Sequence, residues 1–93
     1  MVMASDLTAL AKIPPQYPTW ALERGVEGWV KLTFIVTEQG TVLDPVVTDS
    51  RPSGTFEDSA LAAVARWRFR PVMESGEPQR VRVFLHVDFE IPE

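Results

Sequence analysis

The sequence predicts an α+β fold, a two-layer sandwich whose three-stranded antiparallel sheet, in the strand order 2-1-3, carries two helices packed on one face. Residues 29–37 and 80–91 alternate apolar and polar side chains, which is the period of a half-buried strand. Residues 56–67 carry an apolar stripe at helical spacing. A loop at 38–40 joins the first strand to a second at 41–49. Because the helix crosses back over the sheet, the last strand runs parallel to the second, which places the first strand between them.

Composition bounds the class of protein. The chain has 93 residues, a net charge of −4, no cysteine and one histidine. This length allows one domain with a modest core. Without cysteine there is no disulfide or thiolate zinc site, and one histidine excludes a histidine-rich metal site. The acidic balance argues against nucleic acid as a partner, and no apolar run is long enough to cross a bilayer.

The first third of the chain has little regular structure by pattern. We expect residues 1–12 to be an N-terminal segment outside the domain, which then spans residues 13–93. Three prolines within residues 14–18 predict an extended segment. Thr19 is the expected cap of a short helix over residues 20–24.

The long helix follows a loop, and its start resembles a capping box. Thr55 stands three residues before Asp58, so the two side chains are expected to bond each other's backbone amides. The stripe predicted to face the sheet consists of Phe56, Ala60, Ala63, Val64 and Trp67.

The two outer strands differ in how their free edges are protected. Pro45 lies inside the second strand and cannot donate to a ladder, so that strand is an edge or is bulged there. The last strand has no such residue. Either a loop, the N-terminal segment or a neighbouring molecule covers its free edge, or the edge accepts an extended peptide by strand addition. About six new backbone hydrogen bonds would give a gross stabilisation of about 3–9 kcal/mol, compatible with micromolar binding.

No pattern of catalytic residues is present. Glu57 and Asp58 are accounted for by the helix start, and Asp88 and Glu90 have no nucleophile or second acidic site beside them. The sequence contains no phosphate-binding glycine loop and no metalloprotease or nucleophile-elbow motif. We therefore expect no catalytic residue, no metal and no cofactor.

A series of short motifs in a fixed order resembles the TonB C-terminal domain family. The resemblance covers about residues 13–91, and its most specific parts are the Tyr-Pro and Trp-Arg-Phe-x-Pro motifs. The motifs are Pro15-Gln16-Tyr17-Pro18, Gly28-x-Val30-x-Leu32-x-Phe34-x-Val36, Gly40-x-Val42, Ser50-x-Pro52-x-Gly54-x-Phe56, Ala63-Val64 and Trp67-Arg68-Phe69-x-Pro71.

The resemblance implies a binding module rather than an enzyme. It implies a periplasmic domain of an inner-membrane-anchored protein of a Gram-negative bacterium, which works with an ExbB–ExbD motor driven by the proton gradient. Such a domain grips the TonB box, an extended segment of outer-membrane receptors, and pulls so that siderophores, haem, cobalamin or similar ligands enter. Membrane contact is expected only through an anchor outside this sequence.

The resemblance also assigns partner-binding residues. The Gln-Tyr-Pro motif would lie on the receptor side, and the last strand would pair with the TonB box. The residues are Gln16, Tyr17 and Pro18, then Arg80, Val81, Arg82, Val83, Phe84, Leu85, His86, Val87, Asp88 and Phe89.

Several alternatives stay open on the sequence alone. The fold also suits a TolA-like envelope-bridging domain, or a structural module that forms a homodimer through its last strand. Tyr17 either contacts a receptor or packs on Pro15 and Pro18. Five arginines between residues 66 and 82 form either a solvated surface or a contact with acidic receptor loops.

Overall fold

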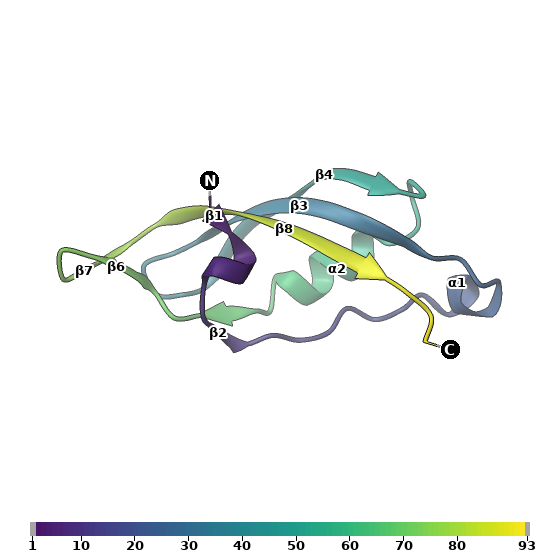
Figure 1. Ribbon diagram of the computed structural model, residues 1–93, viewed down its shortest axis with the longest axis horizontal. Helices are drawn as coiled ribbons and strands as arrows, with labels where there is room; N and C mark the ends of the chain where they lie inside the picture. The colour runs from purple at the N-terminus through teal and green to yellow at the C-terminus, as the bar shows by residue number, and fades with distance from the viewer. Residues whose placement is uncertain (1, 93) are drawn as a thin grey trace.

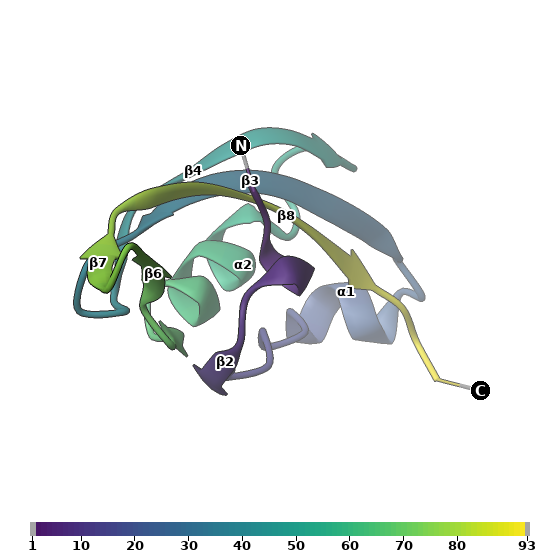
Figure 2. The same ribbon diagram turned by 60° about the vertical axis from the view of Figure 1, so that its left-hand side comes forward.

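A computed structural model, which describes residues 2–92, shows a mixed four-stranded sheet with both α-helices on one face (Figures 1 and 2). The strand order is β1-β8-β3-β4. The sheet strands are β1 (Val2–Met3), β3 (Gly28–Val36), β4 (Val42–Arg51) and β8 (Val81–Phe89), and the helices are α1 (Thr19–Glu23) and α2 (Glu57–Val64). The smaller elements are the 3₁₀ turn η1 (Ala4–Asp6), the pair β2 (Ala9–Ala11) and β5 (Arg68–Phe69), and the pair β6 (Val72–Glu74) and β7 (Glu77–Gln79).

The α+β class with two helices on one face agrees with the prediction, but the three-stranded, all-antiparallel sheet is wrong. The long strands do lie with β3 between β4 and β8, antiparallel to both. The difference is β1, which adds a fourth strand parallel to β8. A strand of two residues is too short to show alternation in a sequence.

The two long ladders differ in regularity. β3 and β8 pair without interruption from Gly28↔Phe89 to Val36↔Val81. The β3–β4 ladder shifts register twice, and one shift spans Asp44 (φ 50°) and Pro45. Both alternatives for the proline therefore hold, because β4 is an edge strand and is also bulged at that point.

The core lies between the sheet and α2. The inward side chains of β3 are Val30, Leu32, Phe34 and Val36, and all four are fully buried. The predicted helical stripe from Phe56 to Trp67 is buried against them. Phe56 stacks on Phe89 with ring centroids 4.3 Å apart, so α2 is fixed directly to the end of β8.

The start of α2 differs from the predicted capping box. The helix begins at Glu57, and neither Thr55 nor Asp58 makes a capping bond. Instead, the Glu57 carboxylate accepts hydrogen bonds from the Gly54 amide (2.7 Å), the Phe56 amide (3.1 Å) and the Ser50 hydroxyl (2.9 Å). These bonds lower the pKa of Glu57 despite its partial burial.

The predicted cap of α1 is also wrong. Thr19 is the first residue of the helix itself, and the preceding Pro18 makes no side-chain cap bond. Pro18 has the preset φ of proline (−59°) and carries no side-chain oxygen that could accept from the first amides of the helix.

Residues 8–17 pack along the side of α2 that faces away from the sheet (Figures 1 and 2). The Trp67 indole donates to the Ile13 carbonyl (2.8 Å), and the Arg70 amide donates to the Thr8 carbonyl (2.8 Å). Residues 8–17 therefore form part of the packed structure although most of them have no regular secondary structure.

Candidate functional site

The edge of β8 that faces away from β3 is only partly occupied. β1 pairs with it at two positions, Val2↔Val83 and Met3↔Phe84. On that side, Val81–Arg82 and Leu85–Phe89 have no strand partner among residues 2–92. Figure 1 shows β1 beside the first half of β8, while the half toward the arrowhead has no strand in front of it. The predicted open edge is thus present, and the N-terminal segment covers a short part of it.

The side chains of the open half keep its backbone in place. Leu85 and Phe89 are buried in the core, which holds the strand on the helical layer. His86 and Asp88 lie exposed on the other face, with His86 Nε2 2.9 Å from Asp88 Oδ1. The His86 ring stacks on Trp29 of the neighbouring strand at 5.6 Å. This half of the strand is ordered through its side chains, so a peptide would meet a preformed row of backbone groups.

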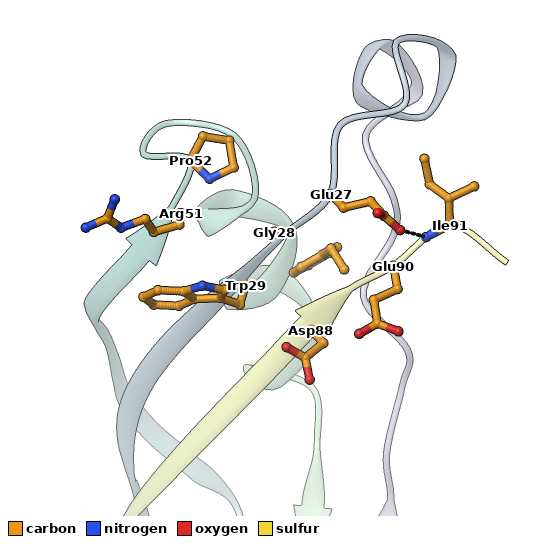
Figure 3. Close-up of a pocket in the computed structure, with 9 residues that line it drawn as sticks. Glu27, Gly28, Trp29, Arg51, Pro52, Asp88, Glu90 and Ile91 are labelled. Carbon is orange, nitrogen blue, oxygen red and sulfur yellow. Dashed lines mark hydrogen bonds between the residues drawn. The ribbon is translucent and has the colours of Figure 1, made fainter.

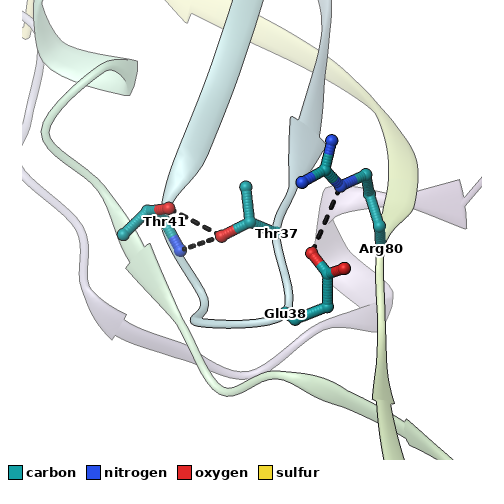
Figure 4. A network of polar contacts seen from close by, with 4 residues as sticks. All are labelled: Thr37, Glu38, Thr41 and Arg80. Carbon is teal, nitrogen blue, oxygen red and sulfur yellow. Dashed lines mark hydrogen bonds and ion pairs between the residues drawn. The ribbon is translucent and has the colours of Figure 1, made fainter.

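A polar contact fixes the beginning of β8 (Figure 4). Arg80 Nε is 3.2 Å from Glu38 Oε1, which lies in the loop between β3 and β4. The backbone amide of Glu38 itself and the Arg80 guanidinium lower the pKa of Glu38. Beside it, Thr37 and Thr41 hydrogen-bond through their hydroxyls (2.6 Å), which closes the loop.

A shallow hollow of about 680 Å³ lies where β8 ends (Figure 3). The Glu27 carboxylate there accepts a hydrogen bond from the Ile91 amide (2.7 Å) and so fixes the direction in which the chain leaves β8. The hollow is lined by Glu27, Gly28, Trp29, Arg51, Pro52, Asp88, Phe89, Glu90 and Ile91.

The residues of the Gln-Tyr-Pro motif contact different parts of the structure, and Pro18 directly precedes α1. Tyr17 packs edge-on against Phe56 (5.5 Å) and Phe89 (5.9 Å), and its hydroxyl donates to the Val26 carbonyl. Partial burial, with the nearby Glu27 carboxylate, raises the pKa of Tyr17. The structure therefore brings Tyr17 to the end of β8, whereas Gln16 lines a separate hollow beside α2.

Two contributions to this site were not defined by the sequence. One is β1: the N-terminal segment was among the alternatives for covering the edge, but its two pairing residues carry no periodic signal. The other is Glu27, an isolated acidic residue before Gly28 whose partner is 64 positions away. Neither has a local signature that distinguishes it from an ordinary surface residue.

Within residues 2–92 no cluster of histidine, cysteine or acidic side chains is arranged to hold a metal ion. Over the same residues, none of the helices has the length and apolar character needed to span a membrane.

Comparison with known proteins gives a consistent result. The family model described as "Gram-negative bacterial TonB protein C-terminal" matches residues 13–91. The TonB protein of Pseudomonas aeruginosa is 41% identical over 73 residues, covering 78% of this chain and 21% of that protein. TonB of Escherichia coli K12 is 38% identical over 69 residues, covering 74% of this chain and 29% of that protein. The chain thus spans a minor part of the length of these relatives.

Solved structures extend the similarity to the fold. The solution NMR structure of the P. aeruginosa TonB C-terminal domain has a TM-score of 0.82 and 36% identity, covering 96% of this chain and 90% of that one. The TonB2 protein of Vibrio anguillarum has a TM-score of 0.67 and 35% identity, covering 92% of this chain and 82% of that one. The predicted resemblance is confirmed: the chain belongs to the TonB C-terminal domain family.

Proposed function

We propose that this chain is the periplasmic domain of an inner-membrane-anchored TonB-type transducer, and that it captures the TonB box of outer-membrane receptors by strand addition to β8. Family membership supports this role. Proteins of the family transduce energy and are not enzymes, which confirms the prediction that the chain is not an enzyme.

The observation that carries the proposal is the contrast between the two edges of the sheet. β4 is bulged and contains Pro45, so a continuous ladder cannot form on it. β8 pairs with β3 without a register shift, and leaves the edge at Leu85–Phe89 without a strand partner among residues 2–92. Strand addition is therefore favoured at one edge only.

The expected affinity follows from the length of the free edge. Five free residues allow about five backbone hydrogen bonds, or a gross stabilisation of about 3–7 kcal/mol. Ordering a flexible peptide offsets part of this, which leaves dissociation constants in the micromolar range or weaker. A peptide that lies along β8 loads its hydrogen bonds together when it is pulled, which suits the transmission of force.

The remaining residues and partners have supporting roles. We place Gln16, Tyr17 and Pro18 on the receptor side, with Tyr17 supporting the end of β8 through Phe89. The region from Arg80 to Phe89 forms the pairing strand. The motor partner would be ExbB–ExbD, and the imported ligands would be siderophores, haem, cobalamin or similar compounds.

Two other functions share this fold. A TolA-like bridging domain is disfavoured because the relatives described above are TonB proteins. A homodimer through β8 uses the same edge as the peptide, so it competes with the proposed function. Sedimentation at several concentrations separates the two, since a chain that stays monomeric retains a free edge.

The test is a titration of the 15N-labelled chain with a synthetic TonB-box peptide from a receptor of the same organism. Chemical shifts should change mainly at Leu85–Phe89. Adjacent residues of a strand point their amides to opposite sides. Of the variants His86→Pro and Val87→Pro, one should therefore lose binding with the fold retained. His86→Ala keeps the backbone amide and is the matched control. Unchanged spectra at millimolar peptide exclude the proposed function.

A further inference from the structure

The short strand β1 lies on the edge of β8, and a role for it in peptide binding rests on the proposed function of that edge. β1 runs parallel to β8 and occupies the positions beside Val83 and Phe84. A peptide strand that extends from Leu85 toward Val83 would need the backbone groups that β1 occupies. We propose that β1 is an internal competitor, which occupies part of the peptide site in the free protein and is displaced on binding.

The contacts of β1 suit a segment that detaches without unfolding the domain. Among the residues that the structure describes, two residue pairs join it to β8, and Met3 is 54% exposed. The residues that follow are held more firmly. Ala4 is buried in the core, Leu7 packs against it, and Thr8 accepts a hydrogen bond from the Arg70 amide. A break before Ala4 would therefore release β1 and leave the rest of the segment bound.

The free half of the edge provides a starting point for exchange. Leu85–Phe89 adjoin the covered positions and have no strand partner on that side among the residues described. A peptide can form its first hydrogen bonds there while β1 is still in place. Extension toward Phe84 and Val83 then replaces β1 pair by pair.

The arrangement has a consequence for affinity. A peptide that needs the covered positions binds only the open form, so its apparent affinity falls by the fraction of molecules in which β1 is detached. A variant in which β1 cannot form its one or two backbone hydrogen bonds with β8 should therefore bind the peptide about tenfold more tightly. A peptide confined to Leu85–Phe89 should be unaffected.

The experiment opens or locks β1 in this 93-residue chain, with the synthetic TonB-box peptide as the probe. The double variant Val2→Pro/Met3→Pro removes both amides of β1, so whichever of them pairs with β8 is lost, and it should lower the dissociation constant about tenfold. Leu10→Ala is the control, because Leu10 is exposed in the same segment and has no pairing with β8.

A disulfide provides the opposite perturbation. The chain contains no cysteine, so Met3→Cys with Phe84→Cys introduces a single pair on neighbouring strands. Oxidation should lock β1 on the edge and weaken peptide binding at least tenfold relative to the same protein when reduced. The oxidised and reduced forms have the same sequence, so they differ only in the disulfide.

The outcomes separate the two proposals. If the oxidised and reduced forms bind equally well, and Val2→Pro/Met3→Pro binds like the wild type with shifts at Leu85–Phe89, internal competition is wrong and strand addition stands. If no form binds, including Val2→Pro/Met3→Pro, the proposed function fails and β1 has no ligand to compete with.

Discussion

Replacing Gly28 with alanine tests whether the close approach of β3 and β4 fixes this end of the sheet. Gly28 is the first residue of β3. An added Cβ would lie 1.9 Å from the Arg51 carbonyl oxygen and 2.9 Å from its carbonyl carbon. Both atoms belong to the backbone of β4, so no side chain can rotate away to relieve the clash. Gly28 does not have a left-handed φ, and the cost is therefore steric alone.

The magnitude follows from the movement required. The strands must separate by about 1.5 Å before this 1.9 Å approach becomes an ordinary van der Waals contact. This separation disrupts the end of the ladder, at Trp29↔Arg51 and Val30↔Ser50. Loss of about two backbone pairs plus the associated packing gives about 2–4 kcal/mol. For a domain of this size, that corresponds to a fall in Tm of about 10–25 °C.

Two other glycines are matched controls. Gly25 has φ +70° with nothing near its added Cβ, so alanine there should cost only the left-handed backbone penalty, about 1 kcal/mol. Gly40 combines φ +82° with a contact of 2.0 Å to the Phe69 carbonyl oxygen, so it should cost about 3–5 kcal/mol. Urea unfolding followed by circular dichroism measures all three variants. If Gly28→Ala destabilises the chain no more than Gly25→Ala does, the close approach of β3 and β4 does not fix this end of the sheet.

Three further predictions concern single hydrogen-bonding groups. Glu57→Gln should cost about 1 kcal/mol at pH 7. Because folding lowers the pKa of Glu57 from 4.5, this contribution should vanish as the pH falls through the folded-state pKa; an undiminished difference in urea midpoint at pH 2 would contradict it. Trp67→Phe removes the donor to Ile13 and should cost about 1 kcal/mol in urea unfolding, with faster proteolysis of residues 1–13; unchanged cleavage would show that this bond does not hold the segment. Tyr17→Phe keeps the ring contacts but loses the bond to Val26, so the Tm should fall by about 4–8 °C; an unchanged Tm would assign the role of Tyr17 to its ring.

The long elements were predictable because each has a strong periodic signal. The alternation in β3 and β8 identified the inward residues, and the stripe from Phe56 to Trp67 identified the buried face of α2. Pro45 located the blunted edge from a single residue, because proline has the same chemical effect on any ladder. The predicted caps of the two helices were wrong because a cap has no such context-independent signal. The choice between Thr55 and Glu57 depends on the path of the preceding loop, which a local pattern does not define.

The candidate site was predictable as an edge but not in its details. The pairing of β1 with β8 joins residues about 80 positions apart and involves two residue pairs, so nothing local announces it. Tyr17 shows the same limit. Its neighbours in sequence are prolines, whereas its ring contacts, Phe56 and Phe89, come from α2 and β8.

The bulges of β4 also restrict how copies of this chain can assemble. Pairing the β8 edge of one copy with the β4 edge of the next would repeat without end and produce a fibre. Pro45 and the two register shifts interrupt that second surface, so head-to-tail growth has no continuous template. Two copies that pair through β8 instead occupy the β8 edges of both molecules, so the assembly stops at a dimer. The irregular strand therefore limits self-association to a finite size, even when the opposite edge is free.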